Sequence, residues 1–335
     1  MKTGFYWKTV APLKAGLVAA VGREELRELH RRVWWRHFLV LLRQVALLLA
    51  AAYGALWLEN PFFWLPLSVY IGFTAFNFTV LLHEAVHLTI FERSHPFLDA
   101  VMGQLYALPS GISRSQFTRW HLDHHNELGT GDRDPKRHWL TPKVVRRWYK
   151  LLYCTPALFP IYFRAAAREA ATYPESLRAR IRRERLVTTA VHVAAMAALV
   201  VFLGALAFVK LYAVPYFLVF PVAFTLNRLG QHYNIDPTSP LKWGTLMKPS
   251  RLWDFLFLYS NYHLEHHYFP TVPFYNLRTL HFRLRDFYRA HGIRPHTYRE
   301  ILWGWFVENH VPHTNWSEAR PGDAGVTRPS SVAAR

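Results

Sequence analysis

The sequence of 335 residues contains a single cysteine, Cys154. One cysteine can form neither an internal disulfide nor, by itself, a thiolate site for a metal ion. It also excludes an iron–sulfur cluster, which needs several cysteine thiolates. We interpret Cys154, in the apolar stretch LLYCTP, as an inert apolar residue. Any metal chemistry in this chain must therefore come from its 19 histidines.

Acidic residues are also scarce. The chain has 22 Asp and Glu against 40 Lys and Arg, a formal net charge of +18, while 51% of its residues are hydrophobic and 16% are aromatic. Such a balance suits a nucleic acid, an acidic protein or anionic lipid headgroups as partners. The hydrophobic share is high for a soluble globular protein, and no nucleic-acid-binding module is recognisable, so the sequence favours a membrane and no nucleic acid.

Long apolar runs are present, and they come in two pairs. Three of them are long enough to cross a hydrocarbon core of about 30 Å as helices, and the fourth needs its flanking residues. Short breaks at Glu59–Asn60 and at Val209–Lys210 separate the members of each pair, which predicts two antiparallel helical hairpins. Buried helices of a large soluble protein are the alternative, but they rarely give two such pairs. The four predicted spans are residues 37–58, 61–82, 186–208 and 211–226.

The basic residues predict the orientation of these hairpins. Of the 40 Lys and Arg, 38 lie outside the hairpins, and the two exceptions are Arg43 and Lys210. By the positive-inside rule, both termini and the long loop between the hairpins are cytoplasmic. The first apolar run begins too far from the N-terminus, and is too long, for a cleaved secretory signal. We therefore expect an integral protein of a bacterial inner membrane.

The sequence predicts one membrane domain with a flanking segment on each side. Residues 1–36 form a cytosolic, interfacial N-terminal segment that includes Trp34 and Trp35, a pair suited to the headgroup level. Residues 37–316 form the membrane domain. The tail at 317–335 is small, polar and proline-containing, which is typical of a disordered segment.

Histidine occurs in three closely spaced boxes near the predicted cytoplasmic ends of the spans. HEAVH (83–87) follows the second span directly, and HLDHH (121–125) and HLEHH (263–267) repeat one spacing. Positions i, i+3 and i+4 share one face of a helix, so each HxxHH box presents three imidazoles to the same side. Together with His232, beyond the fourth span, they suffice for two metal ions, whereas one zinc ion takes four ligands. The predicted ligands are His83, His87, His121, His124, His125, His232, His263, His266 and His267.

Two other classes of protein fit part of this histidine pattern. HEAVH also matches the HExxH pattern of zinc proteases, in which two histidines bind zinc and the glutamate, here Glu84, is the general base. A membrane zinc metalloprotease would leave the six histidines of the HxxHH boxes without a function. A haem protein with two axial histidines would place its ligands inside the spans, where His192 lies without a partner.

The order of the boxes and of the isolated histidine, over residues 38 to about 300, resembles the membrane fatty acid desaturase superfamily, which also includes hydroxylases and ketolases. The stretch NYHLEHHYFPTVPFYNLRTLH is especially similar to the third box of bacterial acyl-lipid and sphingolipid desaturases. The resemblance implies an all-α integral membrane protein of mushroom shape. Four transmembrane helices would form two hairpins, and a cytosolic helical cap would hold a di-iron site on the nine histidines. In some relatives an asparagine stands four residues before the isolated histidine; here Asn227 precedes His232 by five, and Arg228 takes the fourth position.

The implied activity is the O2-dependent removal of two hydrogens from a lipid acyl chain, with hydroxylation or ketolation of a lipid or carotenoid as the alternative. A methylene group has no acidic proton, so the oxidant must come from metal and oxygen rather than from acid–base side chains. Two iron ions are the expected cofactors and O2 the co-substrate, with zinc as an occupant in purified protein. Because the chain has neither a cysteine cluster nor a fused haem-domain signature, it needs an external electron donor of the ferredoxin or cytochrome type.

Two further sets of residues are predicted to serve this site. The apolar segment 97–112 is too short to span and contains Gly and Pro, so we expect it to be interfacial or re-entrant and to line the route of the acyl chain. Polar residues in or near the boxes either orient the ligand imidazoles or cap and solvate their own helices. These candidates are Glu84, Asp123, Asp236, Asn261 and Glu265.

A reporter protein fused after Trp316 tests the predicted orientation. We expect the reporter to be cytosolic, because nearly all basic residues lie outside the hairpins on one predicted side. Protease accessibility or reporter activity on either side of the membrane measures this. A reporter on the outer side would contradict the topology with all nine histidines at the cytoplasmic face.

Overall fold

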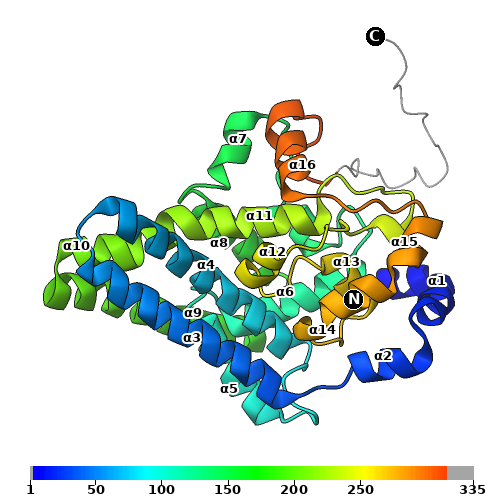
Figure 1. The fold of residues 1–335 in the computed structure, drawn as a ribbon, viewed down its shortest axis with the longest axis horizontal. Helices are drawn as coiled ribbons and strands as arrows, with labels where there is room; N and C mark the ends of the chain where they lie inside the picture. The colour runs from blue at the N-terminus through cyan, green and yellow to red at the C-terminus, as the bar shows by residue number, and fades with distance from the viewer. Residues whose placement is uncertain (1–2, 315–335) are drawn as a thin grey trace.

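The computed structural model describes residues 3–314, and these residues are mainly helical (Figure 1). No β-strand occurs among them, and Met247 and His296 form an isolated bridge. The helices have these bounds: α1 Phe5–Val21, α2 Arg23–Leu29, α3 Trp34–Trp57, α4 Pro61–Val86, α5 Pro96–Ala107, α6 Arg114–Glu127, η1 Lys136–Leu140, α7 Arg147–Leu152, α8 Leu158–Ala170, α9 Glu175–Leu203, α10 Ala205–Phe208, η2 Val209–Val219, α11 Phe220–His232, η3 Pro240–Lys242, α12 Arg251–Leu256, α13 His263–Tyr268, α14 Phe274–Arg283, α15 Arg285–Ala290, α16 Tyr298–Leu302 and η4 Trp303–Glu308.

Helices α3 and α4 form the first hairpin, and both are long and apolar enough to cross a membrane. The start of α4 is stabilised by Asn60, whose side chain accepts a 2.9 Å hydrogen bond from the N–H of Phe62, while Pro61 takes the first helical position. The break predicted at Glu59–Asn60 is confirmed. Helix α3 begins at Trp34 rather than at residue 37, so it includes the two tryptophans assigned to the preceding segment.

The second hairpin turns at a different place from the predicted one. Helix α9 ends at Leu203, and Gly204 has a φ of 85°, a left-handed conformation that glycine adopts readily. The helical chain then continues from Ala205 to His232 through α10, η2 and α11. The break predicted at Val209–Lys210 is wrong, since these residues lie within the fourth span.

Lys210 is accommodated inside the fourth span because it has a partner. Its side chain is buried, and its Nζ donates a 2.7 Å hydrogen bond to the carbonyl of Leu58, just after α3. The carbonyl of Lys210 accepts a 2.6 Å hydrogen bond from Oγ of Ser68 on α4. These contacts tie the second hairpin to the turn of the first one. A charged residue in an apolar sequence can therefore lie within a span when the protein gives it a hydrogen-bond partner. Without such a partner, the charged residue marks a turn.

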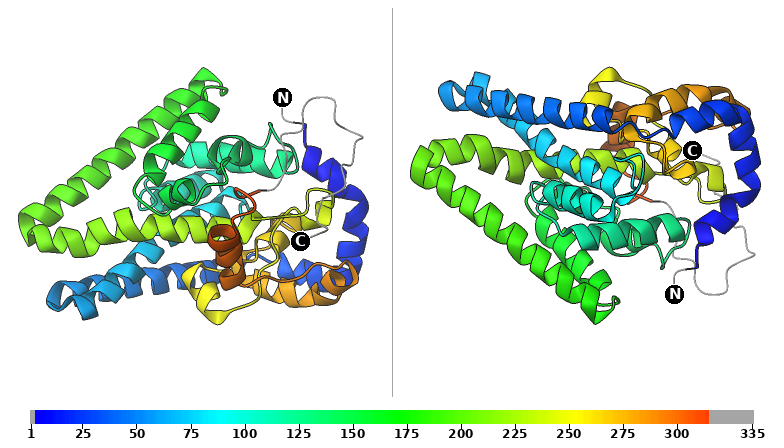
Figure 2. Two further views of the ribbon diagram at one scale, coloured as in Figure 1. Left: turned by 90° about the horizontal axis from the view of Figure 1, so that it is seen from above. Right: turned by 90° about the horizontal axis from the view of Figure 1, so that it is seen from below.

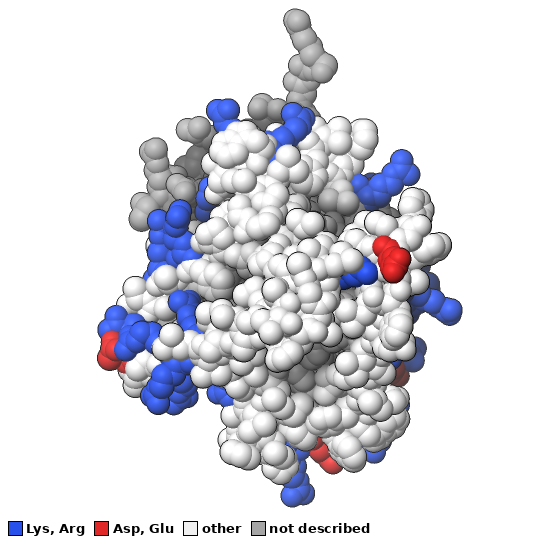
Figure 3. All heavy atoms as spheres, turned by 90° about the vertical axis from the view of Figure 1, so that its left-hand side faces the viewer, with Lys and Arg blue, Asp and Glu red and all other residues white. Residues whose placement is uncertain are grey.

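The four spans differ in how much of their surface the protein itself covers. In the most apolar window of each helix, 67% of α4 is buried, against 17% of α3 and 6% of α9. Helix α4 is thus the central helix, and α3 and α9 present apolar side chains outward, as lipid-facing helices do. Figure 3, which looks onto the hairpin turns, shows a broad face with few charges and with Lys and Arg mainly at its margins. The chain is a membrane protein, and the part of it that the structure describes has four helices able to span the bilayer.

The remaining helices gather at the end opposite the hairpin turns and form a cap (Figures 1 and 2). Helix α9 reaches this cap because it begins at Glu175, well before the predicted start at residue 186. Its Glu184 accepts hydrogen bonds of 2.6 Å from the hydroxyls of Ser113 and Ser115, at the start of α6. A carboxylate stabilises the N-terminus of a helix. The third span therefore positions the cap helix that carries HLDHH.

The segment 97–112 does not span. It consists of α5, which packs against α4, followed by a turn in which Gly111 has a φ of 71°. The prediction that this segment is too short to cross a membrane is confirmed. The tail predicted to be disordered, residues 317–335, lies outside the described residues.

Candidate metal centre

The three histidine boxes and His232 meet in the cap. His83 lies in the last turn of α4, and His232 is the last residue of α11, which continues beyond the predicted end of the fourth span. Helix α6 carries HLDHH (121–125), and α13, a helix of six residues, carries HLEHH (263–267). Two membrane-spanning helices and two cap helices thus bring the predicted ligands to one place.

The nine imidazoles form two groups, and each HxxHH box contributes to both. Within each group the candidate ligand nitrogens lie within 4.8 Å of one another. Residues i and i+4 of a box enter the same group because they are only about 40° apart around a helix, whereas residue i+3 lies about 60° to the other side and enters the other group. The first group is His83, His87, His121, His125 and His266, and the second is His124, His232, His263 and His267.

Ring nitrogens within a group face one another at short distances. Nε2 of His87 lies 2.8 Å from Nε2 of His121. Nε2 of His232 lies 3.1 Å from that of His124 and 3.0 Å from that of His263. Two lone pairs at such a distance repel each other unless a proton or a cation lies between them. A cation bound by each group would remove this repulsion.

The environment keeps these imidazoles in the neutral form that binds metal ions. Burial lowers their pKa well below the usual value, because a charged ring would lose its hydration and repel neighbouring cations. Metal ligands must be unprotonated, so the low pKa favours binding. Two all-histidine groups fit metal ions that accept several nitrogen ligands, such as iron or zinc. The pKa is lowered in this way at His87, His121, His125, His263, His266 and His267.

Asp134, which the sequence analysis did not single out, orients one of the rings. Both of its carboxylate oxygens lie 2.9 Å from Nδ1 of His124, which directs Nε2 of that ring into the second group. Burial by itself would raise the pKa of Asp134, but attraction to His124 and the hydrogen bond from it prevail and lower the pKa to about 2. The carboxylate also accepts a 3.0 Å hydrogen bond from the N–H of Lys136. The one signal in the sequence is the Asp–Pro pair at 134–135, which is typical of a helix start.

Lys136 contacts a ring of the first group in a similar way. Its Nζ lies 2.9 Å from Nδ1 of His121. Burial, followed by repulsion from the Arg228 guanidinium, lowers the pKa of Lys136 to about 7, although Asp134 acts in the opposite direction. This contact occupies Nδ1 of His121, while Nε2 of the same ring faces the first group.

The polar residues predicted to orient the ligands serve mainly to brace the cap. Glu84 does contact a box histidine, since its Oε1 lies 3.3 Å from Nδ1 of His83. Its Oε2 accepts a 3.1 Å hydrogen bond from the N–H of Phe274, which ties α4 to the start of α14. The other four bind residues outside the nine histidines: Asp123 binds Arg119, Glu265 binds His281, Asp236 binds Thr238 and Asn261 binds Asp254.

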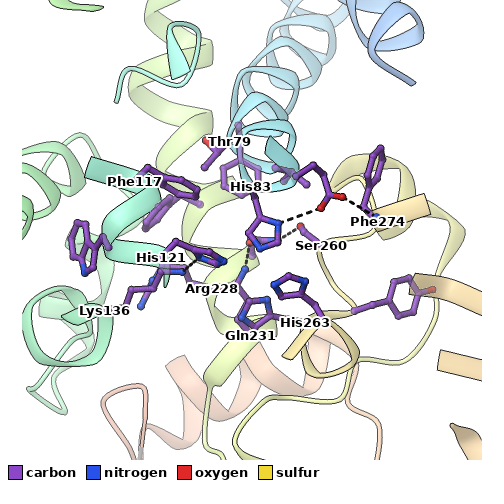
Figure 4. A pocket seen from close by; sticks show the side chains of 18 of the residues that line it. Thr79, His83, Phe117, His121, Lys136, Arg228, Gln231, Ser260, His263 and Phe274 are labelled. Atoms are coloured by element: carbon purple, nitrogen blue, oxygen red, sulfur yellow. Dashed lines mark hydrogen bonds and ion pairs between the residues drawn. The ribbon is translucent and has the colours of Figure 1, made fainter. Parts of the chain in front are cut away.

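A cavity opens beside the first group. Its wall includes His83, His121, His263 and His266, and Figure 4 shows the first three around a common space. Most of the remaining lining is apolar, and its aromatic members are Phe76, Phe117, Trp120, Tyr162, Phe224, Tyr262 and Phe274.

A second, smaller and almost wholly apolar cavity adjoins the first one. Residues 110–112 line it, so the end of the predicted segment 97–112 contributes to this path. Together the two cavities form an apolar space that leads to the histidines. The residues common to both walls are Thr79, Phe117, Tyr162 and Phe224.

Asn227 takes part in a row of polar side chains in the wall of the larger cavity. Its Nδ2 donates a 2.6 Å hydrogen bond to Oγ of Ser260, and its Oδ1 accepts a 2.7 Å hydrogen bond from Nε2 of Gln231. Gln231 and Ser260 line the same cavity as His83 (Figure 4). The sequence gives no indication of either residue, because an isolated amide or hydroxyl carries no signal of its position in a fold.

The fold and the site define a membrane protein with two buried histidine clusters, able to hold metal ions, beside an apolar cavity. The chain belongs to the fatty acid desaturase family, whose pattern matches residues 61–299. It is therefore an oxidoreductase of lipid metabolism, which confirms the resemblance seen in the boxes. Membership also argues against the zinc protease interpretation of HEAVH, since that box lies inside the matching region.

Similarity to individual proteins extends over most of the chain. It is 26% identical over 295 residues to the human sphingolipid delta(4)-desaturase/C4-monooxygenase DES2, covering 83% of this chain and 81% of the relative. It is 26% identical over 258 residues to the sphingolipid delta(4)-desaturase DES1 of Xenopus tropicalis, covering 74% and 72%. It is also 26% identical over 273 residues to the chloroplastic sn-2 acyl-lipid omega-3 desaturase (ferredoxin) of Arabidopsis thaliana, covering 72% and 60%. The common feature of these proteins is desaturation of a lipid.

Replacing Asp134 by Asn should weaken metal binding by about 10- to 100-fold, the usual effect of losing the carboxylate behind a metal-binding histidine. The measurement is the metal retained against a graded series of chelator concentrations. Asp236→Asn is the matched control, because this partly exposed aspartate binds Thr238. Equal metal retention in wild type and Asp134→Asn would contradict the orienting role.

Proposed function

We propose that the chain is an O2-dependent di-iron desaturase that introduces a double bond into the acyl chain of a lipid. The observation that carries this proposal is the position of two all-histidine groups beside an apolar space. The reaction removes two hydrogen atoms from adjacent methylene groups. These hydrogens, together with two protons and two electrons from an external donor, reduce O2 to two molecules of water.

Each histidine group would hold one iron ion. Bound iron supplies the oxidant that an unactivated C–H bond requires. The first group offers five ring nitrogens and the second offers four. Asp134 and Lys136 fix the rings of His124 and His121, so that Nε2 rather than Nδ1 faces each group. Zinc competes for the same nitrogens, since it binds them more tightly than ferrous iron does.

The two cavities would bind the acyl chain and exclude water. Aromatic rings at their junction provide an apolar surface for the methylene groups, and the histidines of the first group lie at the wall of the larger cavity. Exclusion of water prevents side reactions of an oxidising centre. The position of the acyl chain relative to the histidines then selects which methylene group reacts.

Hydroxylation is the second candidate activity. Desaturation and hydroxylation share the first hydrogen abstraction, so a small change of pose decides between them. The polar row of Asn227, Gln231 and Ser260 supports this candidate, because it can hold a hydroxyl-bearing product or substrate beside the histidines. The name of the human relative combines a desaturase and a monooxygenase activity.

The substrate class, the orientation and the donor complete the proposal. The names of the relatives suggest a sphingolipid or another acyl lipid, and carotenoids stay the alternative. We place the cap and both termini in the cytoplasm of a bacterial cell, on the strength of the basic residues outside the spans. A ferredoxin- or cytochrome-type carrier would supply the electrons, and the Arabidopsis relative has ferredoxin in its name.

Lipid analysis of a heterologous host with and without the gene tests the reaction. We expect new unsaturated acyl chains that appear only in the presence of O2. New hydroxylated chains alone would favour the second candidate. Hydrolysis of a membrane peptide without O2 or a reductant would instead favour a zinc protease, for which Glu84→Gln would abolish all chemistry.

Elemental analysis of fully loaded protein tests the metal centre. We expect two metal ions per chain, with iron as the active metal, because the histidines form two groups. His266→Ala removes a nitrogen from the first group and should abolish turnover. His310→Ala, at an exposed position outside the boxes, is the control and should keep the full metal content. One metal ion per chain in wild type, or full activity in His266→Ala, would contradict the di-iron assignment.

A further inference from the structure

Helix α1 covers the second histidine group through a single buried side chain. The hydroxyl of Tyr6 donates a 3.2 Å hydrogen bond to the carbonyl of His267, and the two rings meet edge to face with their centroids 5.7 Å apart. The next residue, Trp7, is 38% exposed, and its ring centroid lies 5.0 Å from that of Tyr6. Two adjacent aromatic residues therefore connect the surface to a histidine of the second group.

A second contact connects the same helix to the same group. The carbonyl oxygen of Trp243 lies 2.8 Å from Nδ1 of His232. The centroid of the Trp243 ring lies 6.2 Å from that of Tyr6 and 6.0 Å from that of Phe5. The start of α1 thus approaches two of the four histidines of the second group. The cavity wall, in contrast, includes three histidines of the first group and one of the second. Helix α1 therefore lies against the second histidine group, whereas the cavity opens mainly beside the first group.

The surface of α1 suits a soluble, acidic partner. The helix lies at the end of the molecule opposite the hairpin turns in all views (Figures 1 and 2), where it is far from the lipid-facing ends of the spans. Its sequence contains Lys8 and Lys14, both exposed, and no acidic residue. The neighbouring Arg133 forms an ion pair with Glu127, whose Oε2 lies 2.9 Å from its Nε, so Lys8 and Lys14 supply the net positive charge of this surface.

We propose that α1 is the docking surface for a small acidic one-electron carrier protein, which delivers electrons at the second histidine group. This inference rests on the proposed function, which needs two electrons per double bond. Two reduced carriers would dock in turn, each losing one electron, and their two electrons enter the reduction of O2 to water. Electron transfer slows steeply with distance, so a surface separated from a metal ligand by Tyr6 alone favours a fast transfer. Electron-transfer complexes are small and transient, and opposite charges speed their formation, so one basic helix is a sufficient docking surface.

Charge reversal on α1 tests the docking surface. The probe is a plant-type [2Fe–2S] ferredoxin, and its affinity for the purified, metal-loaded protein is measured by calorimetry at low ionic strength. The double variant Lys8→Glu/Lys14→Glu should bind it about tenfold more weakly or worse, because like charges then face each other. The matched control is Arg180→Glu/Arg183→Glu, two exposed positions on α9 that undergo the same change of charge. The control should bind as wild type does, and both double variants should keep the wild-type metal content.

Trp7→Leu tests the route through the aromatic residues. Stopped-flow spectroscopy compares the rate of reduction by ferredoxin with the rate of reduction by dithionite, which is small and needs no docking surface. We expect the ratio of the two rates to fall in this variant, because the exposed ring lies between the carrier and Tyr6. If the substitution affected only the stability of the protein, both rates would change together and their ratio would stay the same. An unchanged ratio would contradict the route.

Three results would overturn the docking surface. The first is that ferredoxin does not bind to wild type, and the second is that both double variants lose the same affinity for ferredoxin. The third is that Lys8→Glu/Lys14→Glu binds ferredoxin as wild type does and loses only its binding to phosphatidylglycerol vesicles. The last result would make α1 a membrane contact. If any of these results were found but dithionite still supported desaturation, the docking surface would be wrong and the proposed function would stand. Absence of desaturation with every reductant would contradict the function, whatever the affinity for ferredoxin.

Discussion

The structure depends on nine imidazoles whose nitrogens converge, seven of them buried and two, His83 and His87, half-buried. Neutral rings with facing lone pairs repel one another, so the protein must hold them by other means. It does so with rigid attachments: two helices anchored in the hairpins, two cap helices, and buried partners behind individual rings. Glu184 secures the start of α6, which carries HLDHH, and Glu84 ties α4 to the start of α14, the helix that follows HLEHH in the chain. The same convergence makes the site favourable for cations.

The arrangement around the centre separates three environments. The apolar cavities beside the histidines are lined by residues of the spans and of cap helices, among them α6 and α8. The lipid-facing surfaces belong to α3 and α9, which contribute no histidine to either group. The solvent-facing end is covered by α1, which touches the second group. Among the four spans, only α4 and the fourth span, which ends in α11, connect the membrane to the predicted ligands.

The sequence predicts the parts of this structure that depend on local pattern. Apolar runs indicate the four spans, and repeated spacing of histidine indicates the nine candidate ligands. The pattern fails where a tertiary contact decides the outcome. Lys210 was interpreted as a turn residue, because hydropathy does not reveal that the carbonyl of Leu58 would be its partner. Asp134 was missed, because it lies outside the boxes and reaches His124 only after the chain has turned back. The division of each HxxHH box between two groups follows from helix geometry, but it becomes visible only once the facing helices are in place.

The unbroken course of α4 from the hairpin turn to His83 limits how this span can change in evolution. An ordinary membrane span varies in length by several residues without loss, because tilt and lipid adapt to it. Removing one residue between Pro61 and His83 would rotate the ring by about 100° and shift it by about 1.5 Å along the helix. Such a change would take His83 out of the first group. The length of this span is thus set by the chemistry at its end, and any mismatch with the thickness of the bilayer must be absorbed by the lipid or by tilt of the whole molecule.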